Sequence, residues 1–105
     1  MLIQVRTDSN IEGREALTQR VETSVRDALD RFADRVTRVQ VHLGDENSDK
    51  KAGDADMRCT IEVRLAGLEP LAVRDNASTV EQAVDGAIGK LVRAAETSVG
   101  RERGR

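Results

Sequence analysis

Hydrophobic and polar residues alternate in four stretches of the chain, and a period of two is the pattern of a half-buried β-strand. The alternation predicts strands over residues 2–6, about 36–43, 57–65 and 71–74. It is clearest in the third stretch, "MRCTIEVRL", where every second residue is apolar: Met57, Cys59, Ile61, Val63 and Leu65. Pro70 stands at the start of the fourth strand, where its missing N–H is tolerated.

Two longer stretches repeat their apolar residues every three or four positions, which is the spacing of a two-sided helix. The first runs from about Glu12 to Asp34, and the second begins after Ser78 and ends near Gly100. Ser78 is expected to cap the second helix, with Glu81 three residues later. The apolar residues are Leu17, Val21, Val25, Ala28, Leu29 and Phe32 in the first helix, and Val80, Val84, Ala87, Ile88, Leu91 and Ala95 in the second.

The elements therefore follow the order β-α-β-β-β-α. The last three strands pair as antiparallel hairpins, whereas the first strand returns through a helix and so pairs parallel to a neighbour. Both helices need an apolar partner, and only one sheet face offers a large one. We expect an α+β two-layer sandwich, a four-stranded mixed sheet with two helices on one face. It forms a single domain over residues 1–100, followed by a short basic tail at 101–105.

The amino-acid composition and the absence of targeting segments exclude several classes of function. Phe32 is the only aromatic residue among 105, so the core is expected to be aliphatic and base stacking on aromatic rings is excluded. The single cysteine, Cys59, is expected to pack inward as a small hydrophobe. The start "MLIQVRTDSN" lacks a signal-peptide pattern, and no apolar run is long enough to cross a bilayer. We expect a cytoplasmic protein with no membrane partner.

The polar sides of the strands hold an excess of arginine. In this register five arginines face outward against Glu62 alone, a net charge of plus four, although the whole chain has a formal net charge of −2. Acidic residues gather instead in the loop at 44–56. Arginine binds phosphate through two parallel hydrogen bonds, which favours a polyanion as partner. A solvated strand face explains the same pattern, so both interpretations stay open. The outward arginines are Arg6, Arg38, Arg58, Arg64 and Arg74.

Catalysis and metal binding find little support in the sequence. His42 is the only histidine and lies on a polar strand face, where a surface role is the usual one. The segment "GAIGK" lies inside the last helix, without the strand-turn-helix context of a phosphate loop. Its glycines, Gly86 and Gly89, are expected to let the helix approach a neighbour or the sheet. We therefore expect no enzyme, no cofactor and no metal site.

Two segments of the chain resemble the ribosome hibernation promoting factor family, also called ribosome-associated inhibitors, ribosomal subunit interface proteins or sigma-54 modulation proteins. They are "IQVRTDSNIEGREALTQRVETSVRDALDRFADRVTRVQVHL" and "LAVRDNASTVEQAVDGAIGKLVRAAE". The similarity covers about residues 2–97. Its most telling points are "NIE" at the start of the first helix, the junction "RFADRVTRVQVHL", and the opening "ASTVEQAVDGAIGKL" of the last helix.

The resemblance implies a bacterial protein that binds the small ribosomal subunit, through its 16S ribosomal RNA and proteins, when growth slows in stationary phase or stress. Members of that family occupy the decoding channel, where mRNA and the anticodon ends of tRNAs would lie, and so stop initiation without catalysing a reaction. The chain resembles the short, single-domain forms. Salt contacts to ribosomal RNA would hold it in place, in agreement with recognition of structured RNA by shape and phosphate.

Family members carry basic residues on the first helix and a lysine-rich run at the end of the last. This chain departs from that pattern, because its last helix continues as "AAETSVG". The positions that match are Arg20 and Arg26, then Lys90 and Arg93, with Arg101, Arg103 and Arg105 in the tail. Candidate rRNA-binding residues therefore form a helix set, Arg20, Arg26, Lys90 and Arg93, and a sheet set, Arg38, Arg58, Arg64 and Arg74.

Three hypotheses follow from the sequence. The leading one is a ribosome-binding translation inhibitor. The second is a homodimerising protein-interaction module of the same fold without ribosome binding, favoured by the thin basic helix end and the negative net charge. The third is an enzyme that uses His42, which needs a pocket that a flat sheet face does not offer.

Overall fold

The computed structural model describes residues 1–8, 14–45 and 57–103. For residues 102 and 103 it describes the backbone but not the side chains. The elements are β1 (Leu2–Thr7), α1 (Arg14–Ala28), a 3-10 turn η1 (Asp30–Phe32), β2 (Val36–Asp45), β3 (Met57–Leu65), β4 (Leu71–Ala77) and α2 (Val80–Arg103). The predicted acidic loop beyond Asp45 and the predicted start of the first helix at Glu12 lie outside the described residues.

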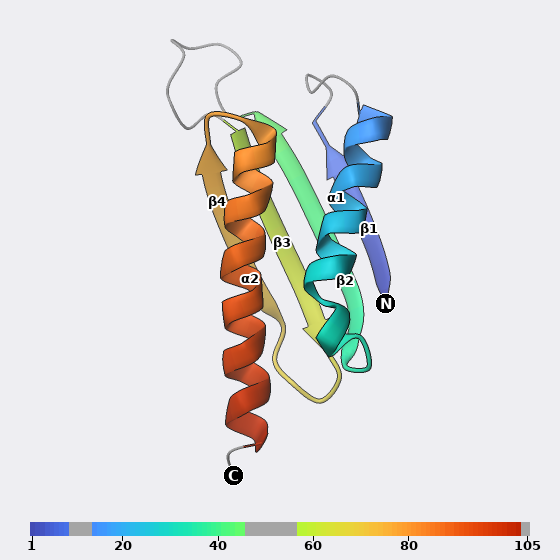
Figure 1. Cartoon of the computed structure of the whole chain (residues 1–105), viewed down its shortest axis with the longest axis vertical. Helices are drawn as coiled ribbons and strands as arrows, with labels where there is room; N and C mark the ends of the chain where they lie inside the picture. Colours follow the sequence, from blue (N-terminus) through green and yellow to red (C-terminus); the bar gives the residue numbers. More distant parts are fainter. Residues whose placement is uncertain (9–13, 46–56, 104–105) are drawn as a thin grey trace.

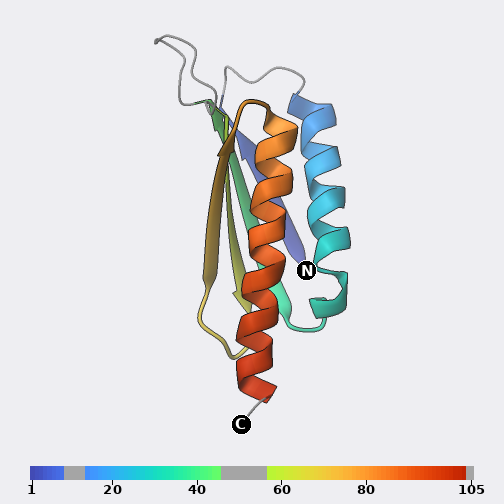
Figure 2. The ribbon, with the colours of Figure 1, turned by 60° about the vertical axis from the view of Figure 1, so that its left-hand side comes forward.

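A single four-stranded sheet organises the fold, in the order β1-β2-β3-β4. β1 pairs parallel to β2, and the other two pairs are antiparallel. Both helices cover the same face of the sheet, which leaves the opposite face without a covering element in the described chain (Figures 1 and 2). The predicted α+β sandwich is therefore confirmed.

The core lies between the sheet and the two helices and is aliphatic, as predicted. Its largest fully buried side chains come from a helix end, two strands and α2: Leu29, Leu43, Ile61 and Leu91. Phe32 joins this cluster from η1 as its one aromatic member. No polar or charged residue is buried in the described part of the chain. The helices are therefore held by apolar burial, and charged groups remain at the surface.

The first helix ends earlier than the sequence pattern predicts. α1 stops at Ala28, and the chain tightens into η1, where the N–H of Phe32 donates to the carbonyl of Leu29 at 2.8 Å. Residues three apart stand directly above one another in such a turn. The tighter turn keeps both Leu29 and Phe32 buried while the chain reverses toward β2. For this reason the helix-like spacing of apolar residues in the sequence extends beyond the end of α1.

The second helix is capped by a different residue from the one predicted. Thr79, not Ser78, accepts a hydrogen bond on its hydroxyl from the N–H of Gln82 at 3.1 Å. β4 runs to Ala77 instead of Arg74, which moves the start of the helix to Val80. Thr79 is therefore the N-cap, one residue later than predicted, and the Gln82 Oε1 accepts a hydrogen bond from the Ser78 hydroxyl at 2.9 Å. At the other end α2 continues to Arg103, past the predicted end near Gly100.

Close packing of α2 on the sheet depends on one of the two glycines singled out in the sequence. A methyl group at Gly86 would overlap the carboxylate of Asp75 on β4, so any side chain there would force that carboxylate to move. At Gly89 the nearest atom to such a methyl group is the Arg93 Nη1 at 3.6 Å, an ordinary contact. The prediction of close approach is confirmed for Gly86 and wrong for Gly89.

Cys59 lies near the start of β3 with no exposed surface, as the alternating pattern predicted. Burial, with a smaller contribution from the charge of Asp75, raises the pKa of its thiol from 9.0 to about 12. The thiol therefore stays protonated at neutral pH and packs as an apolar group.

Candidate nucleic-acid interface

The sheet face opposite the helices, called the outer face below, carries its polar side chains in rows. Strand pairing sets the rows, because directly paired residues point to the same side. One row joins Leu2, Arg38 and Arg64, the next joins Gln4, Gln40, Glu62 and Ala72, and a third joins Arg6, His42, Thr60 and Arg74. Gly44, Arg58 and Asn76 make up a fourth row.

All five arginines predicted to face outward do so. Arg6, Arg38, Arg64 and Arg74 are exposed, and Arg58 is half-buried. A second carboxylate, that of Asp8, lies at the same end of this face, because a methyl group at Gly44 would be 2.9 Å from Asp8 Oδ2 and 3.1 Å from Arg58 Nη2. Five arginines against two carboxylates give the outer face a net charge of plus three, one less than predicted.

Four of these arginines have no carboxylate partner among the residues that the structure describes. Arg38 donates to the Gln4 Oε1 at 3.1 Å, a neutral acceptor on the neighbouring strand. Arg6, Arg64 and Arg74 form no side-chain hydrogen bond or ion pair within the described ranges. Their guanidinium groups are therefore available to an anionic ligand without first breaking an internal pair.

His42 is paired, which the sequence did not predict. Its Nε2 lies 3.1 Å from Asp8 Oδ1, and both side chains are partly exposed. Asp8 follows the end of β1, and its N–H donates to the carbonyl of Leu43 at 3.0 Å, which holds the backbone beside β2. The two residues are 34 positions apart, so only the parallel pairing of β1 with β2 brings them together.

The basic residues predicted on the helices are placed differently. Arg20 reaches Glu81 Oε2 on the other helix at 3.5 Å, and Arg26 reaches Glu22 Oε2 one turn back at 3.1 Å. Lys90 Nζ lies 2.9 Å from Asp75 Oδ1 and also donates to the Arg74 carbonyl at 2.7 Å. Three of the four predicted helix residues are thus already matched with a carboxylate, and the pairs of Arg20 and Lys90 link two elements of the fold.

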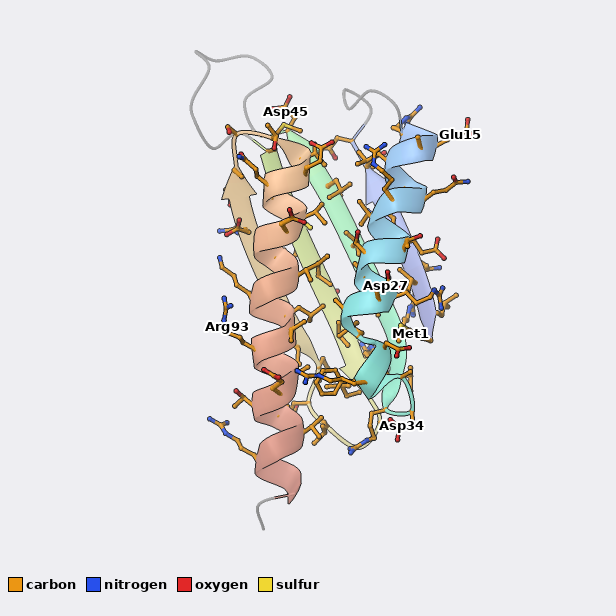
Figure 3. All side chains as sticks on the ribbon, in the orientation of Figure 1. Met1, Glu15, Asp27, Asp34, Asp45 and Arg93 are labelled. Atoms are coloured by element: carbon orange, nitrogen blue, oxygen red, sulfur yellow. The ribbon has the colours of Figure 1, made fainter. Side chains whose placement is uncertain are left out.

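Arg93 is the exception in the helix set. It is exposed on α2 and points away from α1 (Figure 3). Thr97 and Arg101 follow on the same exposed side at helical spacing, and Arg101 also has no carboxylate partner in the described part of the chain. Arg93 and Arg101 are therefore two separated cations on α2, and the remaining tail arginines, Arg103 and Arg105, lie where no side chain is described. The sheet and helix sets occupy opposite sides of the molecule.

Two shallow depressions indent the outer face on either side of the Gln40 and Glu62 pair. One, of about 220 Å³, is lined by Arg6, His42 and Thr60 besides these two residues. The other, of about 150 Å³, is lined by Arg38, Arg64 and Ala72. Both are open to solvent, and no group of three or more metal-ligating side chains occurs among the residues described. The outer face thus has the shape of a broad binding surface and not of an enclosed reaction site.

Comparison with known proteins identifies the family of the chain. The model of the family described as Sigma 54 modulation protein / S30EA ribosomal protein matches residues 3–102. No curated protein matches the chain in sequence. No helix in the described ranges combines the length and apolar content needed to cross a bilayer.

Two solved structures share the fold. The N-terminal domain of Protein Y from Thermus thermophilus superposes with a TM-score of 0.72 at 23% identity, covering 92% of this chain and 98% of that one. A ribosomal subunit interface protein from Coxiella burnetii superposes with a TM-score of 0.66 at 12% identity over 100% of both chains. At these identities the superpositions establish the fold, while the family match spans nearly the whole chain. The chain therefore belongs to the Sigma 54 modulation protein / S30EA family, a family of ribosome-associated proteins.

Proposed function

We propose that this protein inhibits translation by binding the small ribosomal subunit in the channel where mRNA and tRNA meet, and that it thereby promotes ribosome hibernation. The partners are 16S ribosomal RNA and the ribosomal proteins that border the channel, so the protein works in the cytoplasm. No reaction is involved. Occupation of the channel excludes the ligands of initiation.

One observation carries this proposal: a broad, uncovered sheet face holds four arginines that no carboxylate neutralises within the described residues. Arginine matches phosphate geometry with two parallel hydrogen bonds. A flat cationic surface without aromatic rings suits structured RNA, which is recognised by its shape, phosphates and ribose hydroxyls. Membership of a family of ribosome-associated proteins favours ribosomal RNA as the structured RNA in question.

The outer face is the better candidate for the phosphate-contacting surface than the helix side. Binding through Arg20, Arg26 or Lys90 would first break an internal ion pair with Glu81, Glu22 or Asp75. Breaking each of these ion pairs costs free energy, which offsets part of the gain from the new contact with phosphate. We therefore assign the main phosphate contacts to Arg6, Arg38, Arg64 and Arg74, with Arg58 beside them and Arg93 as a peripheral contact.

Sedimentation of the protein with purified small subunits through a density gradient tests the proposal. About four phosphate contacts should weaken the affinity roughly a hundredfold between about 50 and about 200 mM salt, since each neutralised phosphate releases counterions. Co-migration that fades with salt is the expected result. A protein that stays at the top of the gradient at both salt concentrations would refute ribosome binding.

Charge reversal then identifies the face. Arg38→Glu with Arg64→Glu should abolish co-migration, because the two residues are paired neighbours in one row. Arg14→Glu provides a control with one charge reversal on the helix side, since Arg14 is exposed at the start of α1 and Glu is favourable in a first helical turn. Lys90→Glu with Arg93→Glu tests the helix set. Loss of binding in the helix variant alone would place the RNA on the opposite side.

A homodimer is the second candidate, and an edge strand favours it. β1 is an outer strand of the sheet, and its Leu2 is the one large hydrophobic side chain among the described residues that is mostly exposed, at 55%. An open strand edge can pair with the same edge of a second copy. A concentration-dependent dimer by sedimentation velocity, lost in Leu2→Lys and accompanied by no affinity for small subunits, would support this candidate over the first.

A further inference from the structure

The order of the rows on the outer face suggests how it distinguishes RNA from other polyanions. Arg38 and Arg64 occupy one row, and Arg6 and Arg74 occupy another, four residues further along the strands. Successive side chains on one face are about 6.6 Å apart along a strand, so the two arginine rows are about 13 Å apart. Between them lies a row with no cation, formed by Gln4, Gln40 and Glu62 and called the polar row below.

Glu62 is the unusual member of the polar row. It is an exposed carboxylate at the centre of a cationic face, yet no ion pair joins it to any of the arginines there within the described residues. An ionised carboxylate only accepts hydrogen bonds and repels phosphate. Its position therefore disfavours a phosphate at the centre of the face and favours a ligand group that donates a hydrogen bond.

The neighbours of Glu62 leave room for such a group. Gln40 is its direct partner across the β2 and β3 pair, and Gln4 is the next residue along the row. The two depressions meet at Gln40 and Glu62, so a ligand seated in either one reaches this pair from the side. The side-chain Oε1 of Gln4 already accepts a hydrogen bond from Arg38, which fixes the Gln4 side-chain amide in the row.

We propose that the polar row binds ribose 2′-hydroxyl groups and makes the outer face selective for the minor groove of A-form RNA. That groove is wide and shallow and displays 2′-hydroxyls between two phosphate backbones. The arginine rows meet the phosphates at the two margins, and Glu62 accepts the hydroxyl proton in a hydrogen bond at the centre, assisted by Gln40. This inference rests on the proposed function, because it assumes that the outer face meets RNA.

Binding of a short RNA hairpin, compared with the same hairpin carrying 2′-fluoro groups, tests the inference. The fluorinated hairpin keeps the A-form shape and the phosphates but has no 2′-hydroxyl donor. The wild-type protein should bind the natural hairpin about tenfold more tightly, since a hydrogen bond to a charged acceptor is lost in the other. The ratio of the two dissociation constants is the readout. A variant that removes the negative charge of Glu62 would bind both hairpins more tightly to the same extent, so this general effect cancels in the ratio.

Glu62→Ala should bring this ratio close to one, and Glu62→Gln, which keeps an acceptor oxygen, should leave an intermediate ratio. Asp27→Ala is the matched control, because Asp27 is an exposed carboxylate on α1, on the opposite side of the molecule (Figure 3). It should retain the wild-type ratio. Arg64→Gln should weaken both complexes without changing the ratio.

Two results would overturn the inference while the proposed function stands: equal, salt-sensitive binding of both hairpins by the wild-type protein, or a preference that persists in Glu62→Ala. Failure to bind either hairpin or small subunits would remove the proposed function as well. The hairpin comparison and the gradient experiment therefore separate the two failures.

Discussion

Lys90 Nζ lies 2.9 Å from Asp75 Oδ1, which joins α2 to β4 through a carboxylate that points to the helix-covered side of the sheet. Asp75 also occupies the space above Gly86, where a side chain would collide with it. The pair explains why a charged residue is tolerated at an inward position of β4. It also explains why Lys90 is a poor candidate for binding RNA.

Two glycine substitutions on α2 should have opposite effects on stability. Gly86→Ala forces the Asp75 carboxylate away from Lys90 and should lower the free energy of unfolding by about 1–3 kcal/mol, as overpacking does. Gly89→Ala has room for its methyl group and should raise the free energy of unfolding by up to about 1 kcal/mol, the usual gain of Ala over Gly in a helix. Urea unfolding followed by circular dichroism measures both. Equal effects would mean that α2 does not pack on Asp75 as described.

Substitutions at the start of α2 should identify its cap. Thr79→Ala removes the hydroxyl that accepts from the Gln82 N–H and should cost about 1 kcal/mol of the free energy of unfolding. Ser78→Ala removes only an exposed hydrogen bond to the Gln82 side chain and should change the free energy of unfolding by less than about 0.5 kcal/mol. A larger loss in the Ser78 variant would restore the assignment that the sequence alone suggested.

The period-two pattern predicted the outer face well, because strand alternation fixes which side each residue faces whatever its partners are. Each outward arginine was placed correctly for this reason. The pairs of His42 with Asp8 and of Lys90 with Asp75 were not predicted. Both depend on strand ends, since Asp8 and Asp75 lie just past the predicted ends of their strands, where local turn signals and sheet pairing compete.

The alkaline side of the stability profile should report the burial of Cys59. Its pKa is raised to about 12 by burial, whereas the unfolded thiol ionises near 9.0. The folded state therefore holds its proton more tightly, so this contribution to stability is fully present below about pH 9 and is lost progressively between about pH 9 and about pH 12. Relative to Cys59→Ala, the wild-type protein should lose up to about 1.4 kcal/mol of unfolding free energy per pH unit in that window.

Unfolding by urea at about pH 8 and about pH 10, for wild type and Cys59→Ala together, isolates this effect, because the two proteins differ only in the thiol. Parallel loss of stability in the two proteins would show that the thiol ionises normally in the folded state. As an independent check, a thiol reagent should label Cys59 far more slowly in buffer than in urea, since the side chain has no exposed surface.

Removal of the charge of Asp8 should strengthen RNA binding. Asp8→Asn raises the net charge of the outer face from plus three to plus four and frees His42 from its carboxylate partner. The affinity for small subunits at low salt should rise by no more than about fivefold, because a unit charge at contact distance is worth about 1 kcal/mol in water. Asp27→Asn on α1 makes the same charge change on the helix side and should leave the affinity nearly unchanged. Weaker binding by the Asp8 variant would mean that this carboxylate positions Arg58 or His42 for the RNA, and the end of the outer face near Gly44 would then be a specific contact instead of a region of general positive charge.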